Sequence, residues 1–452
     1  MLEEPAAKVG SAMSLFLRKS ACFPALSVCL LLSVSLMAQT TATTNSSAPK
    51  KPVHHRKHGR TTAAAHAATA HSVATHAGTS HQATAHAAAE HPVSTRAGAV
   101  RTKAATKTPV RKADVHRAHR YVGRRYTTSS FLAVQGVGDA TAGEDARVRE
   151  AAIEALGNIH GTAVVIDAST GRILAMVNQS IALAPGAEPC STIKLTVGMA
   201  ALSEGLITRD TMVNLGGFRM NLTQALAHSN NLYFEEVGRE LGFARVHHYA
   251  RLFGLGELAG YKIPGEQLGE YPEREIPASE GGVGRMCSFG QGVSLTPLQL
   301  GAYVAAIAND GTLYYLQHPT TQQEIADFHP RIKRVLPIRR FIPDMQDGMA
   351  GSVEYGTARS LRLSFRELPV FGKTGTCSNL GTRFGWFASY SDTPRGTMAT
   401  VFLLEGGRDL YGPLAAGLTG KFYQALWESH YFDDSAPLEA TNAAPQTAQA
   451  GH

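Results

Sequence analysis

A serine and a lysine three residues apart are the side chains of this sequence best suited to chemistry. The run that follows Ser191 and Lys194 is mostly apolar as far as Leu202, with Gly205 just beyond it, which predicts a buried helix that ends at the glycine. Residues i and i+3 of a helix share a face, so the lysine amine can approach the serine hydroxyl. A desolvated lysine can then act as the base that makes the serine a nucleophile.

The spacing alone is not specific, because Ser47 and Lys50 show it too, with a proline between them that would spoil a helix. A second polar group, Ser229-Asn230-Asn231, lies between two apolar helical patterns and could place a hydroxyl and an amide in a cleft. Ser-Asn is also an ordinary turn or helix cap. The triplet by itself therefore supports either interpretation.

A third group, Lys373-Thr374-Gly375-Thr376, follows the strand-like stretch 368–371. Its lysine could supply positive charge for a substrate carboxylate, and its glycine would let a substrate backbone approach the strand edge closely. A solvated lysine on an edge strand is an equally good interpretation of this segment alone.

Strand patterns lie at both ends of the region that contains these groups, with helical patterns between them. We expect helices at 145–156 and 415–429 and strands at 162–167, 172–177, 384–390 and 397–404. This order predicts an α+β fold, in which one antiparallel sheet combines early and late strands, is flanked by helices and carries an inserted all-helical lobe.

The first 38 residues have the pattern of an export segment. Arg18 and Lys19 precede an uncharged stretch, Ala21 to Ala38, that is rich in Leu, Val and Ser, which is typical of a secretory signal. At about 18 residues this stretch is also barely long enough to span a bilayer. A cleaved signal and an uncleaved anchor both fit, and either places the protein outside the cytoplasmic membrane.

Residues 39–130 form a basic tract rich in Ala, Thr and His. They hold 15 Lys and Arg residues against two acidic ones, a net charge of +13, whereas the whole chain carries +7. The basic charge therefore belongs to the tract, and the remainder is acidic. A composition with so few large apolar residues cannot form a core, so we expect a disordered linker. We place the export segment at 1–38, the linker at 39–130, the folded domain at 131–432 and a disordered tail at 433–452.

Histidine recurs at every fifth position of this tract from His66 to His91. Five-residue steps scatter the imidazoles around a helix and separate them by roughly 16 Å in an extended chain. We therefore favour a solvated spacer over weak metal binding or pH-dependent anion binding.

Three cysteines remain beyond the export segment: Cys190, Cys287 and Cys377. An odd number cannot all pair internally, and their spacing is not that of metal ligands. For Cys190 a small buried apolar residue is favoured over a second nucleophile, since free cysteine is often buried. Cys190 and Cys377 each adjoin a polar motif, and they could bond only if their Cα atoms lie within about 7 Å.

The three polar groups are far more specific together than singly. Ser-x-x-Lys, Ser-x-Asn and Lys-Thr-Gly in this order resemble the penicillin-recognising serine acyltransferases, which comprise penicillin-binding proteins and serine β-lactamases. The segments 162–178 and 289–309 resemble the transpeptidase domains of class B type penicillin-binding proteins, and the resemblance covers roughly 160–430. It implies a β-lactamase/transpeptidase-like fold. It also favours an N-terminal membrane anchor over a cleaved signal, with the domain in the periplasm or another extracytoplasmic space.

The resemblance implies a role for each motif residue. Ser191 would attack the carbonyl of a D-alanyl-D-alanine stem peptide, and Lys194 would accept the serine proton. Ser229 would relay a proton to the leaving amine. Asn231 would orient the lysine and the substrate amide.

The Lys-Thr-Gly strand would bind the substrate. Lys373, Thr374 and Thr376 would hold the terminal carboxylate beside Gly375, and the backbone N–H groups of Ser191 and Thr376 would form the oxyanion hole. This chemistry needs neither a cofactor nor a metal, and we expect none.

The implied function is a peptidoglycan D,D-transpeptidase. A D,D-carboxypeptidase, a serine β-lactamase and a non-catalytic module that binds β-lactams or peptidoglycan stay open, although Asn231 disfavours a class D β-lactamase. The implied partners are peptidoglycan stem peptides, β-lactam antibiotics and, as a candidate, a membrane cell-wall glycosyltransferase, with no nucleic acid. The sequence departs from the family at Pro189-Cys190, where relatives usually have Pro-Gly, and in the short connection 179–190.

Overall fold

The computed structural model describes residues 126–433. The chain divides into two units, 1–111 and 112–452, and the described residues lie in the second. The export segment, the histidine repeat, nearly all of the basic linker and nearly all of the tail that we predict from sequence lie outside the described residues. Between 126 and 433 no helix has both the length and the apolar character needed to cross a membrane.

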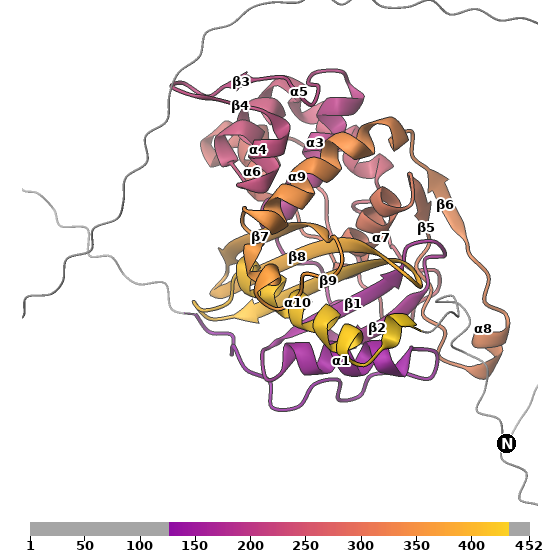
Figure 1. Ribbon diagram of the computed structural model, residues 1–452. Coiled ribbons are helices and arrows are strands. Elements are labelled where there is room, and N and C mark those ends of the chain that lie inside the picture. The colour runs from indigo at the N-terminus through magenta and orange to yellow at the C-terminus, as the bar shows by residue number, and fades with distance from the viewer. Residues whose placement is uncertain (1–125, 434–452) are drawn as a thin grey trace, which may run out of the picture. The chain divides into compact units, whose positions relative to one another are not determined.

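A five-stranded antiparallel sheet forms the centre of the fold (Figure 1). Its strands follow the order β2-β1-β9-β8-β7, so strands from both ends of the described chain meet at the β1–β9 pair. This arrangement confirms the α+β fold expected from sequence. The strands are β1 (Gly161–Asp167), β2 (Ile173–Val177), β7 (Phe371–Asn379), β8 (Thr382–Thr393) and β9 (Gly396–Gly406).

Hydrophobic cores lie on both faces of the sheet. Because successive side chains of a strand point to opposite faces, β1 directs Ala163 and Val165 into one core and Val164 and Ile166 into the other. The helices α1 (Ala146–Leu156) and α10 (Gly412–Glu428) cover the first face and contact each other (Figure 1). The opposite face packs against α7 (Pro297–Ala308) and the rest of the insertion.

The long segment between β2 and β7 forms a mainly helical lobe. Its longest helix, α5, is interrupted at Gly242, whose φ is 72°. The segment also contains two short two-stranded sheets, β3–β4 and β5–β6, which the sequence patterns did not indicate. The other elements of this segment are α2 (Gln179–Ala182), α3 (Lys194–Ser203), β3 (Val213–Asn214), β4 (Arg219–Met220), α4 (Leu222–Ala227), α5 (Asn231–Leu252), α6 (Gly282–Phe289), β5 (Thr312–Tyr314), α8 (Gln322–Ala326), β6 (Ile332–Val335) and α9 (Ile342–Glu354), with 3₁₀ turns including η1 (Cys190–Ile193), η3 (Arg339–Phe341) and η4 (Arg359–Leu363).

Two local expectations near the motifs need correction. Ser191 lies in the 3₁₀ turn η1, and the α-helix begins only at Lys194. The Lys-Thr-Gly motif does not follow a strand at 368–371 but lies inside β7, which begins at Phe371. The strand continues through the motif because every residue from Phe371 to Asn379 pairs with β8.

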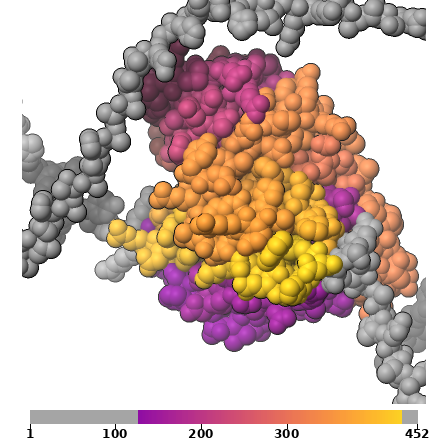
Figure 2. All heavy atoms as spheres, in the orientation of Figure 1, coloured from indigo at the N-terminus to yellow at the C-terminus, as the bar shows by residue number. Residues whose placement is uncertain are grey.

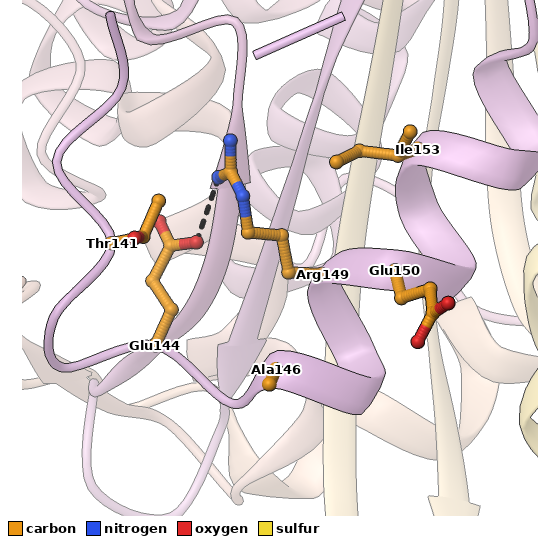
Figure 3. Close-up of a pocket in the computed structure, with 6 residues that line it drawn as sticks. All are labelled: Thr141, Glu144, Ala146, Arg149, Glu150 and Ile153. Carbon is orange, nitrogen blue, oxygen red and sulfur yellow. Dashed lines mark hydrogen bonds and ion pairs between the residues drawn. The ribbon is translucent and has the colours of Figure 1, made fainter.

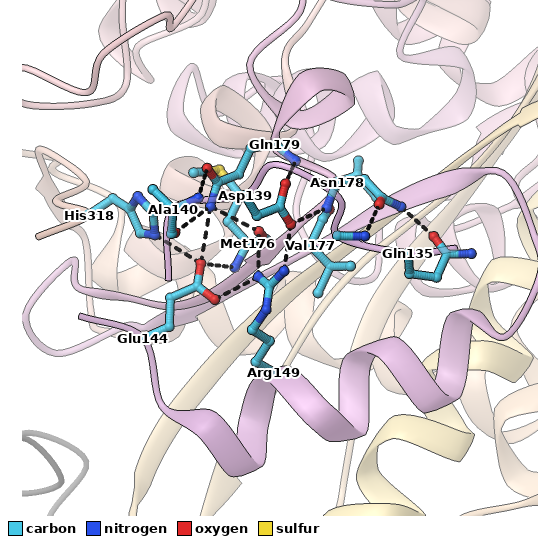
Figure 4. Close-up of polar contacts among 12 residues, drawn as sticks. Gln135, Asp139, Ala140, Glu144, Arg149, Met176, Val177, Asn178, Gln179 and His318 are labelled. Carbon is cyan, nitrogen blue, oxygen red and sulfur yellow. Dashed lines mark hydrogen bonds and ion pairs between the residues drawn. The ribbon is translucent and has the colours of Figure 1, made fainter. Parts of the chain in front are cut away.

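A buried polar network fastens the segment before α1 to the end of β2 (Figure 4). Arg149 of α1 forms ion pairs with Asp139 at 2.7 Å and with Glu144 at 2.8 Å, and these carboxylates are only 3% and 1% exposed. Glu144 also accepts a hydrogen bond from the Met176 backbone and lies 2.9 Å from His318 Nε2. Figure 3 shows the arginine reaching from the helix towards Glu144. One guanidinium thus balances two buried carboxylates.

Replacing Arg149 by methionine should destabilise the fold strongly. The substitution leaves two buried carboxylates without their cation, which typically costs about 3–5 kcal/mol. Urea unfolding of the full chain measures the loss. The matched control is Arg339→Met, because Arg339 pairs with Asp310 at the surface with 80% of its side chain exposed, and such pairs contribute about 0–1 kcal/mol. Equal effects of the two substitutions would contradict the proposed importance of the network.

Candidate active site

The three polar motifs meet in one place between the lobe and the edge strand β7. Lys194 Nζ lies 2.6 Å from Ser191 Oγ and 2.7 Å from Asn231 Oδ1. Lys373 Nζ, from β7, donates to Ser229 Oγ at 2.8 Å. The structure therefore brings together all five residues that the sequence marks as catalytic, although they come from three distant segments.

The amine of Lys194 is surrounded in a way that suits a base. Its third neighbour is the backbone carbonyl of Ser288, at the end of α6, 2.6 Å from Nζ. A neutral amine has two N–H bonds and one lone pair. When its two N–H groups donate to Asn231 Oδ1 and to the Ser288 carbonyl, the lone pair faces the hydroxyl of Ser191.

Electrostatics favours this neutral form. Lys194 is fully buried, and burial lowers the pKa of its amine well below the usual value. The charge of Lys373 lowers this pKa further, whereas the charge of Glu235 raises it in part. Lys373 is also fully buried, and burial lowers its pKa to about 7. Because both amines are buried and the charge of Lys373 acts on Lys194, a state in which both are charged is disfavoured.

Ser229 reaches the site from a strained corner between α4 and α5. Its φ of 54° lies in the left-handed region, which non-glycine residues rarely adopt. The next residue, Asn230, caps α5 by accepting a hydrogen bond from the Tyr233 backbone at 2.9 Å. The cap stabilises the turn, and the turn directs the serine hydroxyl at Lys373.

Gly375 lets the turn that carries Ser191 approach β7 closely. A Cβ at this position would lie 2.8 Å from the Pro189 carbonyl oxygen and 3.1 Å from Thr192 Cγ2. We expected this glycine to admit a substrate backbone, but the atoms that crowd it belong to the turn that carries Ser191. Its role in this structure is the close packing of the two walls of the site.

The two threonines of the motif contact segments outside β7. Thr374 Oγ1 lies 2.6 Å from the hydroxyl oxygen of Thr357, which follows α9. Thr376 Oγ1 accepts a hydrogen bond from the backbone of Gly412, at the start of α10, at 2.8 Å. Both hydroxyls are thereby oriented before any substrate binds.

A disulfide joins Cys190 to Cys377, with the two Cα atoms 5.5 Å apart. It links the residue before Ser191 to the residue after the Lys-Thr-Gly-Thr motif. The favoured interpretation of Cys190 as a free cysteine is wrong. The unpaired member of the three cysteines beyond the export segment is Cys287, which is buried. The cross-link holds the turn that carries Ser191 against β7.

The backbone at Cys190 explains why its position usually favours glycine. Its φ is 53°, in the left-handed region, where glycine carries no steric cost and other residues lose of order 1–3 kcal/mol. The turn has further support from Trp386 of β8, whose indole N–H donates to the Glu188 carbonyl at 3.0 Å. Disulfide and indole together hold this turn in a strained conformation.

Sequence reasoning missed three participants in this site. The Ser288 carbonyl carries no sequence signal, because any residue has one, and Thr357 and Trp386 become relevant only through the fold. Across the described range, 126–433, no three His, Cys, Asp or Glu side chains are grouped as metal ligands.

Comparison with known proteins agrees with this geometry. Residues 161–419 match the family described as penicillin binding protein transpeptidase domain. The chain belongs to this family. Stage V sporulation protein D of Bacillus subtilis is 30% identical over 220 residues, covering 43% of this chain and 33% of that protein. Peptidoglycan D,D-transpeptidase FtsI of Escherichia coli K12 is 27% identical over 256 residues, which cover 49% of this chain and 41% of that protein.

Solved structures of transpeptidase domains show the same fold. A chain of a peptidoglycan synthase complex superposes with a TM-score of 0.50 at 23% identity, covering 63% of this chain and 61% of that one. The D,D-transpeptidase domain of a peptidoglycan glycosyltransferase from Eggerthella lenta superposes with a TM-score of 0.51 at 19% identity, covering 63% of this chain and 81% of that one. This chain spans less than half the length of the curated relatives named above.

Removing the disulfide should lower the free energy of unfolding, and the size of the loss should depend on which residue replaces Cys190. Cys190→Ala with Cys377→Ser loses the cross-link, which typically contributes roughly 2–5 kcal/mol. Cys190→Gly with Cys377→Ser should be about 1 kcal/mol more stable than the alanine pair, since glycine tolerates the left-handed backbone. Urea unfolding of the full chain measures both. An unfolding midpoint of the wild type that does not change with dithiothreitol would contradict the cross-link.

Proposed function

We propose that this protein is a peptidoglycan D,D-transpeptidase that forms an acyl-enzyme on Ser191. The observation that carries the proposal is the 2.6 Å contact between the Ser191 hydroxyl and the buried amine of Lys194, whose pKa is lowered well below its usual value. The printed name of the Escherichia coli relative, peptidoglycan D,D-transpeptidase, supports the same reaction.

Acylation would begin at the penultimate residue of a stem peptide that ends in D-alanyl-D-alanine. Ser191 Oγ attacks the carbonyl carbon while its proton passes to Lys194 Nζ. The carbonyl oxygen becomes an oxyanion, which the backbone N–H groups of Ser191 and Thr376 would stabilise, and one such donor is worth about 3–4 kcal/mol of barrier. Collapse of this intermediate breaks the peptide bond and leaves an ester on Ser191.

The leaving D-alanine needs a proton on its nitrogen and groups that bind its carboxylate. The hydroxyl of Ser229 would relay a proton to the departing nitrogen, and Asn231 would keep Lys194 and the substrate amide in place. Lys373, in contact with Ser229 at 2.8 Å, would hold the carboxylate together with Thr374 and Thr376. The amine of a second peptide then attacks the ester, loses its proton to the same base and regenerates Ser191.

The cellular setting forms part of this proposal. We place the reaction outside the cytoplasmic membrane, with a domain near 131–432 held there by the N-terminal segment as an anchor. The structural likeness to a chain of a peptidoglycan synthase complex supports a cell-wall glycosyltransferase as a partner. Water as the acceptor would make the protein a D,D-carboxypeptidase or a β-lactamase, and an unreactive Ser191 would leave a module that only binds.

Fluorescent penicillin tests the acyl-enzyme directly. A β-lactam resembles the D-alanyl-D-alanine end, so the wild-type protein should be labelled covalently and Ser191→Ala should not be. A label that persists for many minutes supports the transpeptidase, whereas release within seconds indicates a β-lactamase. An unlabelled but folded wild type would overturn the acyl-enzyme proposal.

The rate of penicillin acylation should depend on pH as a bell-shaped curve. As pH falls, Lys194 gains a proton and can no longer act as base. As pH rises through about 7, Lys373 loses the proton whose charge holds the penicillin carboxylate. Lys373→Arg should move the alkaline limb upward, because a guanidinium stays charged above pH 12. Stopped-flow acylation at several pH values measures both limbs, and an alkaline limb unmoved in Lys373→Arg would contradict this assignment.

A further inference from the structure

A cavity lies between the segment that follows α9 and the start of α10. Its volume is about 490 Å³. Figure 2 shows this face of the molecule, where the orange segment around α9 lies against the yellow α10. Side chains that line the cavity include Thr357, Arg359, Arg362, Leu363, Arg366 and Pro413.

Hydrogen bonds connect this cavity to the Lys-Thr-Gly strand. Thr357, in its wall, lies 2.6 Å from Thr374 through the two hydroxyl oxygens. Pro413 follows Gly412, whose backbone N–H donates to Thr376 Oγ1. The cavity therefore adjoins the end of the site where we place the terminal carboxylate of the donor peptide.

The cavity is cationic. Three arginines line it, and no acidic side chain does. Arg362 forms an ion pair with Glu354 at 2.7 Å, and Arg366 Nε donates to the Arg362 carbonyl at 2.9 Å. Glu354 and Glu367 line a separate pocket that shares Arg362 and Arg366 with this cavity. Among residues 126–433, no carboxylate forms an ion pair with Arg359 or with Arg366. Leu363, 83% exposed, adds an apolar surface to the wall.

Arginine at such a position suits a carboxylate ligand. Its planar guanidinium binds carboxylates through two parallel hydrogen bonds, and the exposed leucine can contact the apolar part of a peptide. Ligands of this class are peptides that carry free carboxylates, as stem peptides do at their D-alanine end.

The reaction sequence indicates which peptide reaches this cavity. The attacking amine of the second peptide takes the place that the leaving amine of D-alanine has vacated, because both bond to the same acyl carbon. The acceptor must therefore pass the threonines that held the leaving group. Thr374, one of them, contacts the wall of the cavity through Thr357.

We propose that this arginine-lined cavity binds a carboxylate of the acyl-acceptor peptide and so selects the acceptor strand. The inference rests on the proposed transpeptidase function and adds the acceptor-binding part of the site. Arg359 and Arg366 are specificity-determining residues in this scheme. They do not touch the acyl carbon, so they are not required for acylation.

A pair of acceptor peptides tests the proposal with the full-length protein. Both have the stem-peptide sequence with a free side-chain amine, but one ends in a carboxylate and the other in an amide. A synthetic thioester serves as acyl donor, and the cross-linked product is measured by mass spectrometry. Wild type should use the carboxylate peptide about tenfold more efficiently, through a lower KM for the acceptor.

The variant Arg359→Gln with Arg366→Gln should lose this preference while its rate with the amide peptide and its penicillin acylation stay unchanged. The matched control is Arg339→Gln with Arg340→Gln, which removes the same charge from exposed positions of η3 and should keep the preference. A wild type that uses both peptides equally would overturn the inference. A loss of cross-linking activity with both peptides in the cavity variant would also overturn it, because it would indicate that the two arginines have a structural role.

Penicillin labelling separates this failure from failure of the proposed function. If the wild type is labelled but shows no preference between the acceptors, only the inference about the cavity fails. If the folded wild type is not labelled at all, the transpeptidase proposal fails first. Inorganic phosphate should compete for the same arginines and remove the preference of the wild type, whereas a preference that phosphate leaves unchanged would contradict anion binding by these arginines.

Discussion

The buried contact between Lys194 and Ser191 is the constraint on which the rest of the site depends. An amine can accept the serine proton at neutral pH only if it is kept uncharged, and here burial and the nearby charge of Lys373 both lower its pKa. Both effects require that the two lysines are buried together, although they lie almost 180 residues apart in the sequence. The sheet brings them together, since its edge strand β7 carries Lys373 to the lobe that carries Lys194. The fold thus acts chiefly by setting the charge state of one amine.

Close approach of the two walls is the second requirement, and a glycine, a disulfide and the Trp386 indole meet it. Gly375 leaves room for the Pro189 carbonyl, and the disulfide between Cys190 and Cys377 then holds the turn in contact with the strand. The left-handed backbone at Cys190 stores strain. A cross-link whose second end is anchored in a five-stranded sheet can maintain that strain, because the sheet does not yield with the turn. The cysteine that departs from the usual glycine is therefore compensated by its partner.

Local patterns in the sequence were enough to predict four of the five sheet strands, the flanking helices and the three motifs, but not the edge strand β7. The terminal strands were visible because their apolar residues are nearly continuous, and the motifs because their order is specific. Contacts that depend on three dimensions were not predictable. The pairing of Cys190 with Cys377 spans 187 residues, the Ser288 carbonyl has no side-chain signature, and the position of the Lys-Thr-Gly motif inside β7 follows from pairing with β8. The network around Arg149 was missed for the same reason, since its acids precede the first recognisable helix.

The arrangement also separates the two halves of a transfer reaction in space. The residues proposed as nucleophile, base and proton relay lie on the lobe side, near the starts of α3 and α5. The threonines proposed to bind the carboxylate belong to β7. The arginine-lined cavity lies beyond those threonines, on the connection between α9 and β7. Thr357 of this connection lies against Thr374 and donates through its backbone N–H to the Ala227 carbonyl, two residues before Ser229. Arg359 and Arg366 are exposed side chains farther along the connection. A transferase that must keep its donor chemistry constant while its acceptor varies gains from such a division, because acceptor contacts then add to the site without altering the pKa of the base.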